Sequence, residues 1–240
     1  MKGQKNMPMM NPRVTFDRQL QELQDEVLIL GSMVEAAVLS AVEALKQRDI
    51  AGSQKIYEGD VQINAKRYAI ENDVLTLIAT QQPMARDLRI LAAILEINTE
   101  LERIGDYAKG ISRISIRLGD VPLITPITDL TTMAEMGLDM LHRALGAFVA
   151  RDADTARQIP VEDDQVDLLY NRFYHQLINL MIQDPASIDR ANYLAWAAHN
   201  LERMADRVTN ICERIVFVAT GEMRELDVTD DEDPIRNLPE

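Results

Sequence analysis

Apolar residues recur along this chain every three or four positions, which is the spacing of an α-helix that packs one face into a core. The clearest stripe begins at Phe16 and ends at Leu45, and its near-3.5 period indicates coiled-coil-like packing against neighbouring helices. Comparable stripes predict six long helices, over 14–48, 51–80, 84–118, 127–151, 153–182 and 187–219. Gly and Pro are scarce, and unbranched apolar residues are abundant. These features predict an all-α protein.

Turn-forming residues divide the predicted helices into two groups. The segment 119–126 holds one glycine and two prolines, which is typical of a linker. We therefore expect a first three-helix bundle over 14–118 and a second over 127–220. Residues 1–13 are expected to form a flexible N-terminal tail, and residues 221–240 form an acidic C-terminal tail with few apolar anchors.

The second half of the sequence repeats the first, and this is its most informative feature. With an offset of 103, residues 48–49 align with the identical pair at 151–152, and Asp60 aligns with Asp163. With an offset of 100, the Leu-Glu-Arg run at 101–103 aligns with the one at 201–203. A repeat of this length is too long for a solenoid unit and indicates a duplicated three-helix bundle.

The overall charge narrows the class of partner. The chain has 25 Lys and Arg against 39 Asp and Glu, which gives a formal net charge of −14. This negative charge repels phosphate backbones, so we expect no nucleic-acid partner.

The single cysteine, Cys212, excludes a disulfide framework and fits a reducing cytosol. No secretory signal is evident, and uninterrupted apolar runs are too short to span a bilayer. We expect a cytoplasmic protein without direct membrane insertion.

Four pairs of oxygen-bearing side chains lie one helical turn apart beside the apolar stripes, two in each half of the repeat. Side chains with this spacing share a helix face, and antiparallel helices of one bundle could bring two such pairs together. Oxygen-only ligation suits hard divalent cations or iron. The pairs are Asp60 and Asn64, Glu102 and Asp106, Asp163 and Asp167, and Glu202 and Asp206.

The spacing alone does not establish a metal site. In a chain this acidic, several such pairs arise by chance, and Glu135/Asp139 and Asp227/Asp231 match without any repeat partner. The carboxylates could instead form ordinary surface ion pairs with Arg103, Arg203 and Arg207. Recurrence at equivalent positions of the duplication is what favours metal binding.

Other chemistry-bearing residues give weaker signals. His142 follows Asp139 by three, as in a ferritin-like ligand pair, but such sites need two of these pairs. A ferritin-like metalloprotein for metal redox or storage is therefore an alternative interpretation, as is phosphotransfer through His175 or His199. Cys212 is expected to be an inert core residue. Phosphate-binding glycine loops and nucleophile motifs are absent, so no enzyme is indicated.

Three segments resemble the PhoU family of bacterial and archaeal regulators of phosphate uptake. They are QQPMARDLR at 81–89, LERIGDYAKGI at 101–111 and LERMADRVTNI at 201–211, and the resemblance extends over about residues 16–220. It implies two three-helix bundles related by pseudo-two-fold symmetry and a protein that is commonly a homodimer. The implied function is negative control of the phosphate regulon, through contact with the phosphate-specific ABC transporter and its ATPase and with a PhoR-type sensor histidine kinase.

The resemblance also implies multinuclear metal clusters at the acidic pairs. Glu102, Asp106, Glu202 and Asp206 match the family's acid-x-x-x-Asp signature, as do Asp163 and Asp167. Asn64 departs from that signature because it places a neutral amide beside Asp60. We therefore expect a weaker or differently loaded site in the first half.

Overall fold

The protein is described by a computed structural model that covers residues 12–226. This part of the chain contains helices and no strand, so the all-α prediction is confirmed. Long helices follow the predicted ranges closely, with one exception in the second half. The elements are α1 (Pro12–Gln47), α2 (Ile50–Gln81), α3 (Ala85–Leu118), α4 (Thr128–Ala150), α5 (Ala153–Gln158), η1 (Ile159–Glu162), α6 (Asp163–Gln183), η2 (Pro185–Ser187) and α7 (Ile188–Thr220).

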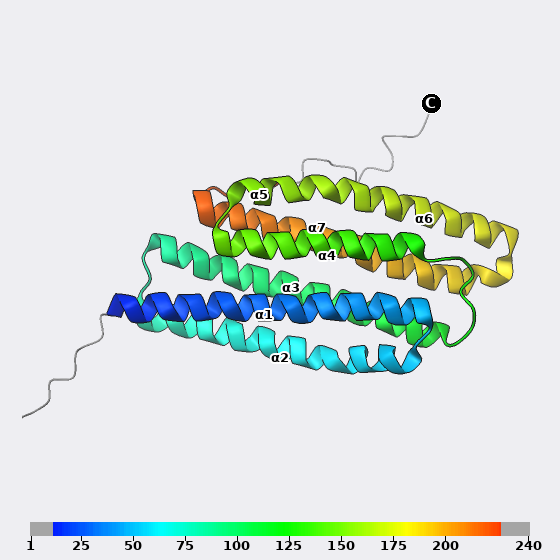
Figure 1. The fold of residues 1–240 in the computed structure, drawn as a ribbon, viewed down its shortest axis with the longest axis horizontal. Helices are drawn as coiled ribbons and strands as arrows, with labels where there is room; N and C mark the ends of the chain where they lie inside the picture. The colour runs from blue at the N-terminus through cyan, green and yellow to red at the C-terminus, as the bar shows by residue number, and fades with distance from the viewer. Residues whose placement is uncertain (1–11, 227–240) are drawn as a thin grey trace, which may run out of the picture.

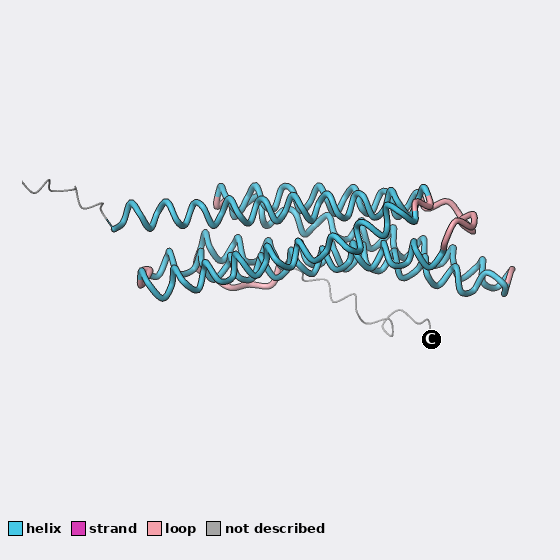
Figure 2. Tube along the Cα trace, turned by 90° about the horizontal axis from the view of Figure 1, so that it is seen from below, coloured by secondary structure: helices cyan, strands magenta, loops and turns pink. Residues whose placement is uncertain are grey.

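The helices form two bundles that lie side by side along a common long axis. Helices α1, α2 and α3 form the first bundle, and α4, α5–α6 and α7 form the second (Figure 1). Seen from below, all helices run lengthwise and the loops lie mainly at their ends (Figure 2). The predicted stripe of α1 is the buried face of that helix, with Val27, Leu30 and Val34 fully enclosed. Burial of such stripes supplies the main driving force for this packing.

The bundles meet through α3 and α7, with a smaller contact between α1 and α4. Helices α3 and α7 run antiparallel, because residue numbers in one rise as those in the other fall. Gly110 permits the close approach, since a Cβ there would lie 2.9 Å from the amide nitrogen of Asn200. The paired positions are Arg89 with Gly221, Glu100 with Asn210, Gly110 with Asn200, and Arg117 with Tyr193.

The repeated Arg-Asp pair forms the same turn in both halves. Arg48 and Arg151 adopt left-handed backbone conformations, with φ of 59° and 56°, and reverse the chain after α1 and α4. The next residue then caps the following helix: Asp49 accepts a hydrogen bond from Gly52 N, and Asp152 accepts from Thr155 N. The duplication seen in the sequence is therefore a duplication of turn geometry as well.

The predicted continuous helix over 153–182 is wrong. Pro160 lacks an amide hydrogen and cannot continue the α-helical bonding, so the chain passes through the short η1 turn between α5 and α6. The described linker residues carry no helix until α4 begins at Thr128. Most of both predicted tails, including Asp227/Asp231, lies outside the described residues.

Among the residues that the structure describes, one helix meets the length and composition of a membrane span, which the short apolar runs in the sequence did not indicate. The candidate segment is Arg13–Gln47, essentially all of α1. In this fold the apolar face of α1 packs against α2, α3 and α4. Core helices of folded bundles share this composition, so the apolar character of α1 is accounted for by packing.

Candidate functional site

The first group of predicted site residues lies where α2 crosses α3. A glycine on α3 allows the two helices to approach closely, since a Cβ on Gly105 would lie 3.1 Å from Ile63 Cγ2. Asp60 and Asn64 lie on α2 on either side of Ile63, and Glu102 and Asp106 lie on α3 around Gly105. Both predicted pairs of this bundle therefore lie at the same contact between α2 and α3.

Asp60 is the buried centre of this group, with 5% of its surface exposed. Its Oδ2 accepts hydrogen bonds from Asn64 Nδ2 at 2.9 Å and from Lys109 Nζ at 2.6 Å. Its Oδ1 is buried and has no hydrogen-bond partner. The Lys109 ammonium also lies 3.9 Å from Asp106 Oδ1 and 5.7 Å from the centre of the Tyr57 ring. The sequence analysis missed Lys109.

The carboxylates of the first group influence one another. Burial raises the pKa of Glu102, and the nearby charges of Asp106 and Asp60 raise it further, while Arg67 acts in the opposite direction. Burial likewise raises the pKa of Asp106, with Asp60 adding to the rise and Lys109 opposing it. The hydrogen bond to Asp60 raises the pKa of Lys109. These residues share one electrostatic environment, in which Lys109 supplies a central positive charge.

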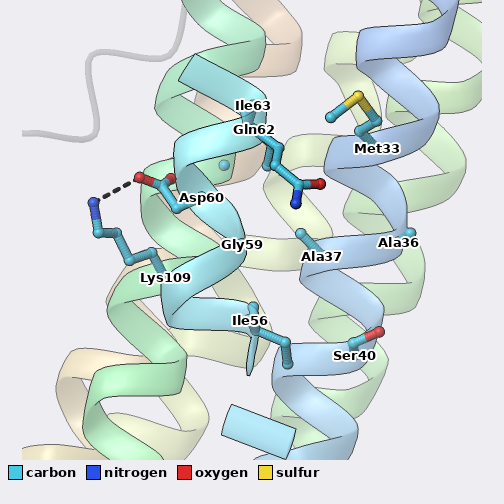
Figure 3. A pocket seen from close by; sticks show the side chains of 11 residues that line it. Met33, Ala36, Ala37, Ser40, Ile56, Gly59, Asp60, Gln62, Ile63 and Lys109 are labelled. Atoms are coloured by element: carbon cyan, nitrogen blue, oxygen red, sulfur yellow. Dashed lines mark hydrogen bonds and ion pairs between the residues drawn. The ribbon is translucent and has the colours of Figure 1, made fainter. Parts of the chain in front are cut away.

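A cavity of about 280 Å³ lies beside this group, between α1 and α2. Its walls are mostly small or apolar, and Asp60 and Lys109 contribute polar atoms at one side (Figure 3). The other lining residues include Met33, Ala37 and Ile56. The Asp60–Lys109 pair therefore borders this mostly apolar cavity.

The second group lies at the corresponding place in the other bundle. Asp163, at the start of α6, is buried, and Asp167 follows one turn later. On α7, His199 Nδ1 lies 3.0 Å from Glu202 Oε2, and Arg203 Nη1 lies 3.1 Å from Asp206 Oδ2.

The facing side chains of α6 and α7 come close together in this second group. Burial raises the pKa of Tyr170 on α6, and the charge of Glu202 on α7 adds to that rise. Burial lowers the pKa of His199, with Arg203 contributing. The imidazole is therefore biased toward its neutral form, which is the form that can ligate a metal.

The donor chemistry of the two groups fits a hard cation unequally. The second group offers four carboxylates, a set suited to Mg²⁺, Mn²⁺, Ca²⁺ or iron. The first offers three carboxylates and an amide, with an ammonium bound among them. Within residues 12–226, no set of three or more His, Cys, Asp or Glu side chains is gathered around one point as a metal site requires.

The remaining candidates lie elsewhere. His142 is largely exposed, with Nδ1 3.5 Å from Glu35 Oε1 on α1, and Asp139 pairs with Arg143 rather than with a histidine. His175 is exposed on α6. Cys212 is buried, and burial raises the pKa of its thiol to about 12. In these positions, His142 and Asp139 do not form half of a ferritin-like centre.

The sequence analysis also missed a polar cluster at the contact between the bundles. Glu100 on α3 is buried and lies 2.9 Å from Arg103 Nη1 and 3.5 Å from Arg207 Nη1. Arg207 Nε donates a hydrogen bond to the hydroxyl oxygen of Tyr107, and Asn210 Nδ2 donates to Glu100. Arg207, which the sequence suggested as a partner for the acidic pairs, thus binds across the α3–α7 contact.

Both halves of the chain match known proteins. Two stretches, residues 27–115 and 130–215, each match the family model described as the PhoU domain. A phosphate-specific transport system accessory protein PhoU homolog from Clostridium acetobutylicum is 34% identical over 215 residues, covering 89% of this chain and 98% of that protein. Another, from Streptococcus pneumoniae serotype 4, is 35% identical over 214 residues, covering 89% and 99%.

Solved structures agree with these sequence matches. The crystal structure of the phosphate transport system regulatory protein PhoU from Streptococcus pneumoniae superimposes with a TM-score of 0.82 at 33% identity, covering 87% of this chain and 99% of that one. The crystal structure of PhoU from Pseudomonas aeruginosa gives the same TM-score at 32% identity, covering 86% and 100%. The similarity therefore extends over both bundles.

Proposed function

Because the chain belongs to the PhoU family, we propose that it is a non-catalytic regulator that represses phosphate-starvation genes when phosphate is plentiful. It does so by coupling the ATPase of the phosphate-specific ABC transporter to a PhoR-type sensor histidine kinase. The observation that carries this proposal is the match of both halves to the family, over nearly the full length of relatives described as accessory proteins of that transport system.

The fold supports an adaptor role because it offers long helical faces for contact with other proteins. Helix α2 exposes an outward row of apolar and aromatic side chains at near-heptad spacing, the pattern that partner helices recognise. The exposed residues of this row on α2 are Tyr57, Val61, Tyr68 and Leu75.

We include a cytoplasmic location and a homodimeric state in the proposal.

We also propose that a hard cation binds the second acidic group. Asp163, Asp167, Glu202 and Asp206 would hold it, and the ion would supply a charge that draws α6 and α7 together. The support is the donor chemistry and the electrostatic contact between Tyr170 and Glu202 across these helices. Without the ion, Arg203 provides part of the charge balance through its ion pair with Asp206.

Deleting the gene in its source organism tests the regulatory role. We expect phosphate-starvation genes to be expressed in phosphate-rich medium in the deletion strain, and repression to return when the wild-type chain is supplied on a plasmid. Expression is measured with a phosphatase or fluorescent reporter under a starvation promoter. Normal repression in the deletion strain would contradict the proposal.

A further inference from the structure

The two acidic groups occupy equivalent places of the duplication but differ in the positive charge near their carboxylates. In the first bundle, Lys109 Nζ lies 2.6 Å from the buried Asp60 (Figure 3). It also lies 3.9 Å from Asp106 Oδ1. The ammonium therefore lies between the α2 and α3 carboxylates, where an ion bridging these helices would also have to lie. Glycine at 105 keeps the helices close enough for Lys109 to reach across.

Three sequence differences between the groups change the charge in the same direction. At the position equivalent to Lys109 the second bundle has Thr209, which is buried and uncharged. Two further positions follow the same trend. Asn64 corresponds to Asp167, and Arg67, whose charge opposes the pKa rise of Glu102, corresponds to Tyr170. At these three positions the first group is neutral or cationic where the second group is anionic or neutral.

Two other differences do not reverse this trend. Arg207 corresponds to Tyr107, but its guanidinium binds Glu100 and Tyr107 at the contact between bundles. His199 corresponds to Thr99 and adds a possible nitrogen ligand near Glu202. The charge difference between the groups therefore comes from positions 64, 67 and 109 and their equivalents.

We propose that Lys109 is the resident cation of the first bundle and excludes metal from it, so that this PhoU homologue takes up metal only in its second bundle. This inference rests on the metal site of the proposed function. A divalent ion entering the first group would have to displace an ammonium that is hydrogen-bonded to a buried carboxylate and would then be repelled by it. In the first bundle the Lys109 ammonium instead balances the carboxylate charge, whether or not metal ions are present.

The experiment titrates the full chain, stripped of metal with a chelator, with Mn²⁺. Electron paramagnetic resonance counts free Mn²⁺, calorimetry gives the affinity, and circular dichroism checks that each variant is folded. Lys109→Thr copies the second bundle, and Lys109→Met removes the charge while keeping the apolar stem over Tyr57. Asp106→Asn and Asp206→Asn are matched changes in the two groups.

In the wild-type background, we expect Asp206→Asn to weaken Mn²⁺ binding by about tenfold or more and Asp106→Asn to leave it unchanged. Both Lys109 variants should bind additional Mn²⁺, and adding Asp106→Asn to either should abolish the gain. Equal losses from Asp106→Asn and Asp206→Asn, or no gain in either Lys109 variant, would overturn the inference. If Asp206→Asn has no effect, the proposed second-bundle site fails and with it the statement about where metal binds, while the gain in the Lys109 variants still decides whether Lys109 excludes metal from the first bundle.

Discussion

At the scale of single residues, Cys212 shows how burial in the core changes the acidity of a thiol. Its side chain is fully buried on α7, and the pKa of its thiol rises from 9.0 to about 12 because burial disfavours the thiolate. We expect alkylation or disulfide exchange at pH 8 to be on the order of 1,000-fold slower in the native protein than in the chain unfolded by guanidinium, because the thiolate fraction falls by about that factor. Thiol labelling followed by mass spectrometry measures both rates.

The same thiol gives a pH dependence with a definite sign. An acid whose folded-state pKa lies above its unfolded value favours the folded state while it stays protonated. As the pH rises above about 9, the unfolded chain ionises first and the native state loses stability. Thermal unfolding of Cys212→Ala should therefore show a flatter decline than the wild type between pH 9 and pH 11, and parallel declines would contradict the assignment.

The acidic pairs were recognisable in the sequence because they recur at equivalent places of a duplication, and their metal binding stays a prediction. Lys109 was not, because its role depends on a long side chain reaching Asp60 on a neighbouring helix, and that reach is set by the close contact at Gly105. Glu100 was missed for a similar reason: its partners Arg207 and Asn210 lie on the other bundle.

At the scale of elements, the turn between α4 and α5 stores backbone strain. Arg151 occupies the left-handed region with φ of 56°, where a Cβ is unfavourable and glycine is not. We expect Arg151→Gly to raise the free energy of unfolding by about 1 kcal/mol, as measured by urea denaturation.

Arg151→Ala is the matched control for that change, because alanine retains the Cβ and should leave stability near the wild-type value. If alanine stabilised the protein as much as glycine, loss of the arginine charge would be the cause, and the strain explanation would be wrong.

Helix positions were largely predictable because the 3.6-residue period is a property of the sequence itself. The break before α6 was not predicted, although Pro160 is visible in the sequence, because the apolar stripe continues through it with Ile159 and Val166 both buried. Pro160 removes one backbone hydrogen-bond donor, and the chain forms the short η1 turn there. The apolar stripe therefore continues across a point where the α-helix is interrupted.

At the scale of the whole molecule, the buried Glu100 cluster joins the two bundles. Removing the carboxylate leaves Arg207 and Asn210 without their common acceptor at the α3–α7 contact. We expect Glu100→Ala to lower the free energy of unfolding by about 2 kcal/mol, as measured by urea denaturation.

The matched control is Glu96→Ala, one turn earlier on α3, where the carboxylate is exposed. That change should shift stability by no more than about 0.5 kcal/mol. Equal effects of the two substitutions would show that the cluster does not stabilise the contact.

The repeat predicted two bundles but not how they pack. The repeat shows that both halves form the same kind of three-helix bundle. The antiparallel contact of α3 with α7 instead depends on small residues such as Gly110 and on polar pairs that differ between the halves. Family membership was predictable because the motifs at 101–111 and 201–211 recur in order, and the matches over both halves confirm it.

The role proposed for this chain is to connect a transporter to a kinase, and recovering its partners from cells tests that role most directly. The tagged full-length chain, expressed from its own promoter, is cross-linked and purified from cells grown at high and low phosphate, and bound proteins are identified by mass spectrometry. We expect the phosphate transporter ATPase and a sensor histidine kinase to be recovered together at high phosphate and to decrease at low phosphate. Recovery of neither protein under either condition would contradict the account.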